Sequence, residues 1–305
     1  MRTFTLKGLF VTAVFMLLGC LAIHAADGDL ITKQITIKLE EAGTLPSKIG
    51  DTKKYKITNL KIMGEINGTD LRFIRKMAGC NEEGRRTEGE LATLDLSGSK
   101  IVKGGDIYFY SSYFYCYTSD DVIGGYAFYG CSSLTSLTLP SNVTKIGESA
   151  FSGCSSLASL TLPSCVTEIG ESAFEGCSSL TSLTLPSSVT EIGRSAFYGC
   201  SGLTSIYVSW ESPLSIDAYT FKDANTEKCI LYVPNGTYDD YWISNWGIFE
   251  NIVEYDATGI NRITTSGDAK EISRYAVDGQ RLEVPAKGLN IVKYSDGCVK
   301  KVVVQ

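Results

Sequence analysis

The most regularly spaced reactive side chains in this sequence are four thiols that lie 23 residues apart. They belong to Cys131, Cys154, Cys177 and Cys200. Thiols can bind a metal, form disulfides in an oxidising compartment, or pack as small apolar groups. A zinc site usually draws on closely spaced pairs of cysteines, and the sequence contains no C-x-x-C. Because the four cysteines occupy equivalent positions, we favour a ladder of buried thiols over disulfides or a metal site.

Other residues that could perform catalysis are scarce. The one histidine, His24, lies in a segment that we expect to be removed on export. Its loss would exclude Ser-His-Asp triads, Cys-His dyads and histidine-ligated metals. Two carboxylates across a cleft can hydrolyse glycosides, but adjacent pairs such as Asp120 and Asp121 are typical of solvated loops. We therefore predict no enzymatic activity, no cofactor and no metal.

The cysteines belong to a repeat with a period of 23 residues. Equivalent phenylalanines and leucines keep the same step: Phe128, Phe151, Phe174 and Phe197, with Leu134, Leu157, Leu180 and Leu203. The unit reads L-x-x-L-x-L-P-x-x-V-x-x-I-G-x-x-A-F-x-G-C-S-x. Leu183 and Leu185 alternate as in a strand with one apolar face, Pro186 ends that strand, and Gly193 permits a turn. This period and the L-x-x-L-x-L pattern fall in the range of leucine-rich repeats.

One such coil cannot bury its own apolar edge, so neighbouring coils must stack. We therefore expect a repeat solenoid with a parallel β-sheet on one face and irregular or short helical returns. Weakened copies of the strand pattern precede it, with a short helix between them that Thr69 or Asp70 could cap. From Leu94 to Leu137 the spacing widens to 43 residues, which we interpret as a degenerate coil plus a loop. Aromatic residues in 238–255 fit a cap over the last coil.

These patterns divide the chain into four parts. Residues 1–25 read as an export signal, with Arg2 and Lys7 before an apolar run and small residues. Residues 26–122 form an N-terminal cap with degenerate repeats, and 123–255 form the solenoid with its C-terminal cap. Residues 256–305 form a linker and a small all-β module with hairpin signals at Asp278-Gly279 and Asp296-Gly297. Cleavage after Ala25 is favoured, while Leu17-Leu18-Gly19-Cys20 offers lipidation of Cys20 as the alternative.

The repeats, such as Ile146-Gly-Glu-Ser-Ala-Phe151-Ser-Gly-Cys154, resemble the BspA-type (treponemal-type) leucine-rich repeats of bacterial surface proteins over roughly 123–234. The C-terminal segment, through Tyr275 to Leu282 and Lys287-Gly288-Leu289, is similar to tails that sort proteins through the Por-type secretion system. The first resemblance implies a non-enzymatic exported or outer cell-surface protein. Its implied role is adhesion to host matrix proteins, to other cells or to another bacterial surface.

Two candidate binding surfaces follow from the repeat. The first is the outward row of the sheet: Thr138, Thr161, Thr184 and Tyr207. The second is the aromatic loop 108–117, with Tyr108, Tyr110, Tyr113, Tyr115 and Tyr117. Threonine also suits strands for solubility, and aromatic residues can pack on one another, so each surface has a purely structural explanation. We expect a protein ligand, with a surface glycan bound by the aromatic loop as the alternative. The formal charge of −6 disfavours nucleic acid.

Overall fold

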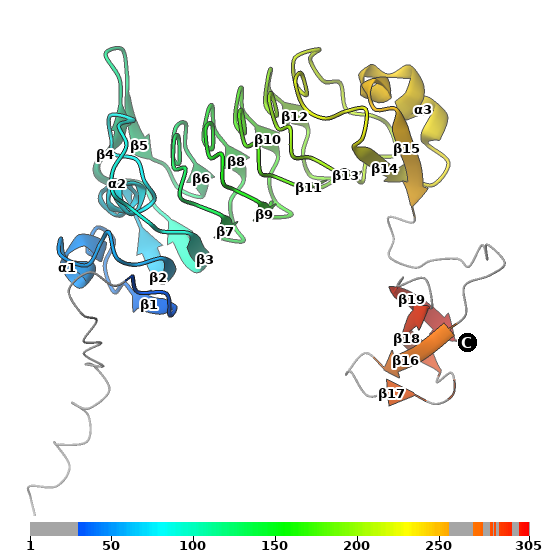
Figure 1. Cartoon of the computed structure of the whole chain (residues 1–305), viewed down its shortest axis with the longest axis horizontal. Helices are drawn as coiled ribbons and strands as arrows, with labels where there is room; N and C mark the ends of the chain where they lie inside the picture. Colours follow the sequence, from blue (N-terminus) through cyan, green and yellow to red (C-terminus); the bar gives the residue numbers. More distant parts are fainter. Residues whose placement is uncertain are drawn as a thin grey trace, which may run out of the picture.

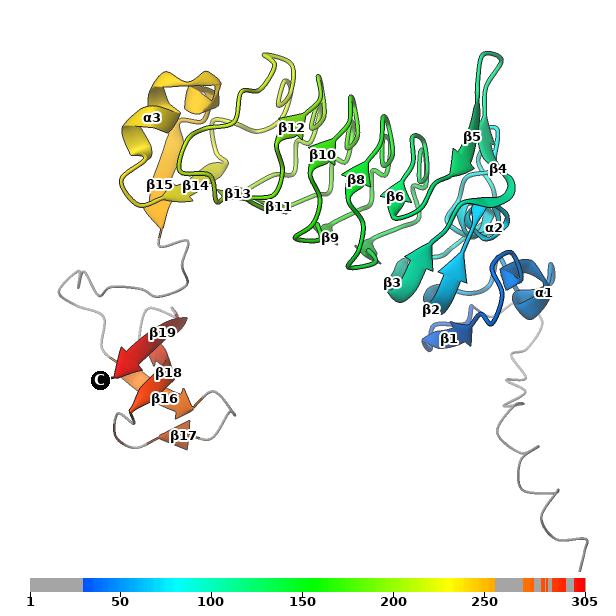
Figure 2. The ribbon, with the colours of Figure 1, turned by 180° about the vertical axis from the view of Figure 1, so that it is seen from behind.

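The structure is a computed structural model of the chain. It describes residues 30–255, 271–276, 281–282, 284, 287–294 and 299–304. The predicted export signal with Cys20 and His24, the linker, and the two Asp-Gly turns lie outside these residues. Residues 30–255 form a row of stacked coils, with β1 and α1 at one end and α3 at the other (Figures 1 and 2).

The main strands of successive coils lie side by side in two parallel sheets. The first sheet has the order β1 (Ile35–Lys38), β2 (Asn59–Ile66), β3 (Thr93–Ile101), β7 (Ser136–Thr138) and β9 (Ser159–Thr161). The second has the order β11 (Ser182–Leu185), β13 (Ser205–Val208), β14 (Ile230–Pro234) and β15 (Asn251–Tyr255). Leu137 pairs with Leu160, and Leu183 with Ile206, so equivalent leucine-type positions stay in register. This arrangement confirms leucine-rich repeats with parallel strands.

The returning side of each coil contains short strands rather than helices. They are β6 (Val122–Ile123), β8 (Lys145–Ile146), β10 (Glu168–Ile169) and β12 (Glu191–Ile192), paired in parallel in the order β12-β10-β8-β6. Of the two expected forms of return, irregular or short helical, the structure shows the irregular one, with turns around these two-residue strands and no helix in 122–229. The residue at position 193 must be a glycine because another backbone segment lies close to it, and not because it forms a turn. A Cβ on Gly193 would lie 2.4 Å from the backbone nitrogen of Glu171, whereas the positive φ of 56° falls on Ser195.

A column of phenylalanine rings runs through the core. The rings of Phe128, Phe151, Phe174, Phe197 and Phe221 stack in succession, with centroids 5.1–5.3 Å apart and planes within 9° of parallel. All five side chains are buried. Each ring covers the face of the next, so the apolar edge of one coil is removed from water by its neighbour. The phenylalanines that keep the 23-residue step thus form one interior column, which extends one coil further, to Phe221.

The four repeat cysteines form the expected ladder of free, buried thiols. Each of the last three Sγ atoms donates to the backbone carbonyl of the phenylalanine 26 residues earlier: Cys154 to Phe128, Cys177 to Phe151 and Cys200 to Phe174, at 3.0, 3.3 and 3.1 Å. Burial raises the pKa of Cys131 and Cys200 to about 12. The thiol is small enough for the corner of the coil and supplies a donor for a carbonyl that is buried there.

The N-terminal part departs from the repeat in two places. Helix α1 (Leu45–Ile49) precedes β2, and helix α2 (Gly68–Met77) follows it. The N-cap of α2 is Asn67, which forms a capping box with Asp70, so the expected cap lies two or three residues too late. Asp70 also accepts from the backbone of Leu45 at 2.9 Å. Its buried carboxylate therefore ties α1 to the first turn of α2.

The widened spacing after Leu94 reflects an insertion into one coil. Leu94 pairs directly with Leu137, so no additional coil lies between β3 and β7. Instead, an antiparallel hairpin of β4 (Gly104–Tyr110) and β5 (Tyr115–Thr118) leaves the coil and projects beyond it (Figure 1). The interpretation as a degenerate coil plus a loop was wrong, because the inserted residues pair with each other and not with neighbouring coils.

Large aromatic residues close the other end of the stack. Helix α3 (Tyr238–Ile243) and the 3-10 helix η1 (Asn245–Ile248) lie between β14 and β15. Tyr241, Trp246 and Phe249 are buried, and Trp246 meets Phe221 at the end of the column with centroids 5.5 Å apart. Further along the chain, β16 (Glu271–Ala276), β17 (Arg281–Leu282), β18 (Gly288–Tyr294) and β19 (Val299–Val304) pair as an antiparallel sheet in the order β17-β16-β18-β19.

Candidate functional site

The outward row of the main sheets changes in chemical character along the stack. At its N-terminal end Lys61 and Asp95, on neighbouring strands, form an ion pair at 2.7 Å. Asp95 pairs with Thr138, and Thr138 with Thr161, so the row continues into exposed threonines. Thr184 then pairs with Tyr207. The structure thus places Thr138 and Thr161 in register in the first sheet, and Thr184 and Tyr207 in register in the second. Along the outward side of the two sheets, the side chains change from charged through hydroxyl to aromatic.

Two rows of threonines on this side of the coils have different roles. In the row nearer the start of the strands, Thr135 and Thr204 donate from Oγ1 to the carbonyls of Ala92 and Thr181 in the preceding coil, at 3.1 and 3.0 Å. In the other row, the hydroxyls of Thr138, Thr161 and Thr184 have no partner among the described residues. A free hydroxyl that faces solvent can donate to and accept from a ligand. The second row, which we call the free threonine row, is therefore the one available for binding.

The free threonine row ends in an aromatic cluster. The ring of Tyr207 stacks on that of Tyr232 in the next coil, with centroids 4.4 Å apart and planes 3° from parallel. Tyr255 meets Tyr207 edge-on at 5.9 Å and donates to the carbonyl of Val208 at 3.0 Å. Tyr207 is half-buried, unlike the threonines. Tyr232 and Tyr255 were missed as candidates, although the alternation in 230–234 places Tyr232 on the same side as Tyr207.

The structure separates the five predicted tyrosines of the aromatic loop into two groups. Tyr113 is 94% exposed, Tyr115 64% and Tyr117 56%, and they occupy the tip and the outer side of β5. Tyr108, by contrast, is buried and donates to the carbonyl of Gly125 at 2.8 Å. Tyr110 is half-buried and donates to the carboxylate of Glu83. Tyr108 is therefore a structural residue of the hairpin base, which corrects the expectation for this tyrosine.

Aromatic residues of the hairpin pack against aromatic residues of the neighbouring coil. The ring of Phe109 stacks on that of Tyr126, with centroids 4.8 Å apart and planes 1° from parallel. Phe114 approaches Tyr126 from near the hairpin tip at 5.0 Å, and Tyr129 meets Phe109 at 5.6 Å. These contacts join the hairpin to the first coil that carries the regular phenylalanine column. The aromatic residues of this segment are thus divided between an inner, packed group and an outer, exposed group.

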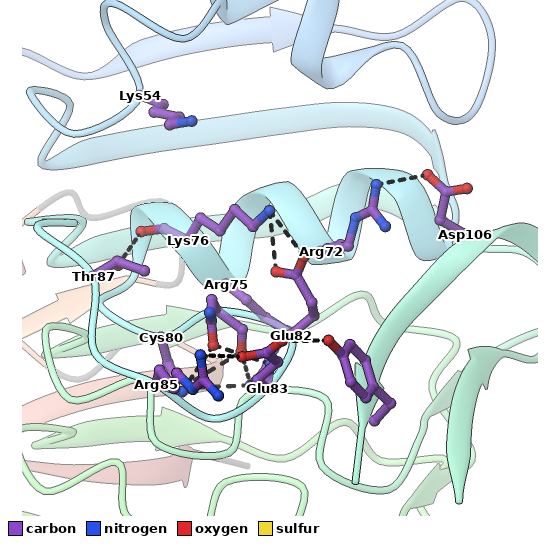
Figure 3. A network of polar contacts seen from close by, with 12 residues as sticks. Lys54, Arg72, Arg75, Lys76, Cys80, Glu82, Glu83, Arg85, Thr87 and Asp106 are labelled. Atoms are coloured by element: carbon purple, nitrogen blue, oxygen red, sulfur yellow. Dashed lines mark hydrogen bonds and ion pairs between the residues drawn. The ribbon is translucent and has the colours of Figure 1, made fainter. Parts of the chain in front are cut away.

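A buried arginine contacts the base of the hairpin and the backbone around it. The guanidinium of Arg75, on α2, lies 5.1 Å from the centroid of the Phe109 ring. It donates to the backbone carbonyls of Tyr126, Ala127, Asn81 and Tyr129 at 2.6–3.1 Å. Around it, Lys76 pairs with Glu82 at 3.0 Å, and Arg72 pairs with Asp106 at 3.0 Å (Figure 3). Charged side chains thus link α2, the loop after it and the hairpin.

The carboxylates of the repeats do not converge on an enclosed cleft. Glu148 accepts from the hydroxyl of Tyr126 at 2.8 Å, and Glu168 pairs with Lys145 at 2.6 Å on the returning side. A cavity under the hairpin, lined by Leu71, Leu96 and other mostly apolar residues, has a volume of about 10 Å³, which is far too small for a substrate. Among the described residues, no group of three or more His, Cys, Asp or Glu side chains could hold a metal ion.

A shallow polar groove lies between the loop 86–90 and the serine corners of the first coils. Ser133 donates there to the carbonyl of Gly89 at 2.7 Å, and Arg86, Glu88 and Ser155 also line it. No helix within the part of the chain that the structure describes is long and apolar enough to cross a membrane.

Comparison with known proteins places the repeats in a family. A model described as the BspA type leucine rich repeat region matches residues 119–245 in six copies. No curated protein matches the chain. Three of the similar solved structures are a leucine-rich repeat protein from Bacteroides ovatus (26% identity, TM-score 0.31), the pneumococcal vaccine antigen PcpA (18%, 0.38) and a leucine rich cell surface protein from Faecalibacterium prausnitzii (28%, 0.31).

The matches to these structures are partial on both sides. They cover 45%, 66% and 46% of this chain, and the chain spans 36%, 57% and 31% of the three solved proteins in the same order. The family match coincides with the coils that carry the phenylalanine column and the thiol ladder. Residues 119–245 therefore form leucine-rich repeats that match the BspA type.

Proposed function

We propose that this protein is a non-enzymatic recognition protein of the cell exterior, which binds a protein ligand through the outward side of its main sheets. The observation that carries the proposal is the free threonine row. Thr138, Thr161 and Thr184 occupy equivalent positions 23 residues apart, face solvent, and have hydroxyls that no described residue engages. Stacked repeats of this kind form a solenoid with an extended binding surface, and leucine-rich repeats generally bind proteins.

The shape and charge of this surface favour a protein ligand. Threonine side chains are short, so three coils present a flat face with no cleft for a small substrate. The ion pair of Lys61 and Asp95 at one end and the Tyr207–Tyr232 stack at the other add electrostatic and aromatic contacts. Aromatic residues are enriched in the binding surfaces of proteins. A host matrix protein or a surface protein of another bacterium fits this face, and adhesion is the role that we infer.

We further propose how the protein reaches the exterior. Residues 1–25 act as a signal peptide that is cleaved after Ala25, with lipidation of Cys20 as the alternative route. The C-terminal segment from Tyr275 acts as a sorting tail of the Por type. Mass spectrometry of the mature N-terminus distinguishes the two routes, since a free Ala26 indicates soluble export and a lipidated Cys20 indicates a lipoprotein.

A binding assay with matched variants tests the proposed surface. Purified fibronectin, laminin and collagen are presented to the mature protein and to a Thr138→Arg/Thr161→Arg/Thr184→Arg variant. The control carries Thr144→Arg/Thr167→Arg/Thr190→Arg, which places three arginines on exposed positions of the returning side. Each of these threonines donates to a carbonyl of the preceding coil at 3.1–3.3 Å, so the unfolding curve of the control is measured beside its binding. Arginine on the flat face should weaken binding at least about ten-fold by steric and desolvation costs, while the control binds as the wild type does. Equal loss in both variants, or no binding by a folded wild type, would contradict the proposal.

A further inference from the structure

We propose that the hairpin β4–β5 is a rigid probe that enters an uncharged recess on a folded protein partner. This inference rests on the proposed function and adds to it a second contact region with a partner surface of stated chemistry. It is carried by three observations: the composition of the hairpin, the division of its side chains between packed and exposed positions, and the number of contacts that hold its base.

Beyond Asp106, which pairs with Arg72 at its base, the hairpin is free of charge although it is exposed. The segment from Ile107 to Ser119 contains no Asp, Glu, Lys, Arg or His, whereas 20% of the whole chain is charged. Its tip is made of serines and aromatic residues, Tyr110-Ser-Ser-Tyr-Phe-Tyr115. Tyrosine and serine dominate antibody binding loops, because tyrosine gives a large, stiff contact area with a polar end and serine gives adaptable hydrogen bonds. The same combination here indicates a surface made for contact with a protein.

The exposed tyrosines lie where a partner would reach them first. Tyr113 stands at the tip with 94% of its surface exposed, and Tyr115 and Tyr117 follow on the outer side of β5. Between them, Cys116 is half-buried, as the alternation of a strand requires. Figure 2 shows the hairpin extending past the ends of the coils, so its tip is clear of the rest of the chain. An exposed apolar patch of this density on a soluble domain is itself a sign of a binding site.

Contacts at the base fix the direction of the hairpin. The Phe109–Tyr126 stack and the Tyr108 hydroxyl on Gly125 hold β4 against the first coil, and the Tyr110 hydroxyl on Glu83 holds it against the loop after α2. Thr118 donates to the carbonyl of Gly104 at 3.0 Å and closes the two strands together. A loop that is already ordered loses little conformational entropy on binding, which favours affinity. The hairpin is therefore preorganised, as a probe for a concave surface must be.

The same observations favour a protein recess over a glycan or a lipid surface. Sites for polar ligands fix orientation with precisely placed polar and charged groups, and the tip offers only hydroxyls. Segments that bind anionic membranes carry Lys and Arg beside the apolar residues, and this one has neither. An uncharged recess lined by apolar carbons and a few hydrogen-bond acceptors complements tyrosine rings with hydroxyl ends.

The test compares two variants that each remove exposed aromatic rings. One variant is Tyr113→Ser/Tyr115→Ser/Tyr117→Ser, and the control is Tyr238→Ser/Trp242→Ser, which removes exposed aromatic rings from α3. Binding kinetics are measured against whichever of fibronectin, laminin and collagen the wild type binds. We expect the hairpin variant to bind about ten-fold more weakly or worse, mainly through faster dissociation, and the control to match the wild type.

The remaining outcomes separate the two proposals. If the wild type binds and the hairpin variant binds equally well, the inference fails and the proposed function stands. If the folded wild type binds none of the three proteins, both fail. A glycan-array signal, or binding to phosphatidylcholine vesicles, that depends on Tyr113 and Tyr115 in the absence of protein binding would overturn the recess and assign the hairpin to that ligand class instead.

Discussion

The regular coils and the β4–β5 hairpin use aromatic rings in opposite ways. In the coils, one phenylalanine per repeat is buried, and all neighbouring rings are parallel within 9°. In the hairpin, rings meet at angles from 1° to 57°, and Tyr113 has almost no contact with the chain. Side chains that repeat with the period are explained by stacking. The aromatic residues that break the period are not explained by stacking, and the exposed ones among them, Tyr113, Tyr115 and Tyr117, are those that we assign to a contact outside the molecule.

Removal of one ring from the column should have the largest effect on stability. Phe174→Ala deletes a fully buried ring between two others and should lower the free energy of unfolding by about 3–5 kcal/mol. Tyr113→Ala in the hairpin should change it by less than about 0.5 kcal/mol, because the ring is exposed. Urea denaturation of the two variants checks both values. A loss for Tyr113→Ala as large as that for Phe174→Ala would break the contrast between the regions.

Loss of the buried arginine should loosen the hairpin more than the coils. Arg75→Met removes a donor from four backbone carbonyls and leaves those of Ala127 and Tyr129 without a partner among the described residues, so it should lower the free energy of unfolding by about 3 kcal/mol. Hydrogen exchange should rise in 104–118 and in 126–129, while amides of β10 and β12 keep their protection. Arg72→Met, which removes an exposed ion pair with Asp106, serves as the control and should have little effect. Uniform loss of protection along the stack would contradict a local role for Arg75.

The thiol ladder predicts sensitivity of the coils to alkaline pH. The pKa of Cys200 is about 12 in the folded state and 9.0 in the absence of burial, so the folded state holds its proton more tightly. The stability from this difference is complete below pH 9 and is lost as the pH rises toward 12. For each buried thiol, the free energy of unfolding should therefore fall by about 1 kcal/mol per pH unit above 9. Thermal unfolding at pH 8 and pH 10 should show a smaller loss for Cys200→Ala than for the wild type.

Substitutions in the two threonine rows should have the smallest effects, and the effects should differ in kind: one row should affect stability and the other ligand binding. Thr204→Ala removes a hydrogen bond to the Thr181 carbonyl and should lower the free energy of unfolding by about 1 kcal/mol. Thr184→Ala removes a hydroxyl without a partner among the described residues, so stability should stay within about 0.5 kcal/mol while ligand binding weakens. Unfolding curves and binding titrations on the same two variants check this. Equal destabilisation by both substitutions would remove the distinction between the rows.

Much of the fold could be predicted because one period repeats the same physical requirement. The 23-residue step determined the phenylalanine column, the buried thiols and the parallel register of the main strands. The return strands could not be predicted in this way, since two residues such as Glu168 and Ile169 carry too little pattern to distinguish a strand from a turn. The cap of α2 was misplaced because Asn67 and Asp70 both suit the position, and only the backbone decides between them.

The candidate site was harder to predict than the fold. The sequence identified the free threonine row and the aromatic loop as surfaces, since strand alternation and composition report exposure. It did not show that Tyr108 is buried, because that depends on contact with Gly125, which no local pattern reveals. The hydrogen bonds from Thr135 and Thr204 to carbonyls of the preceding coil were not predicted either, because they depend on how far each coil is offset from the one before it. Tyr232 was missed because the repeat had weakened by that coil.

Hydrogen exchange of the free and ligand-bound protein tests the central claim most directly. The claim is that the outward side of the main sheets and the hairpin tip contact the ligand, while the returning side does not. Binding of a matrix protein should protect amides in β7, β9, β11 and residues 111–117, and leave β8, β10 and β12 unchanged. Protection confined to the returning strands, with 111–117 exchanging as in the free protein, would contradict the account.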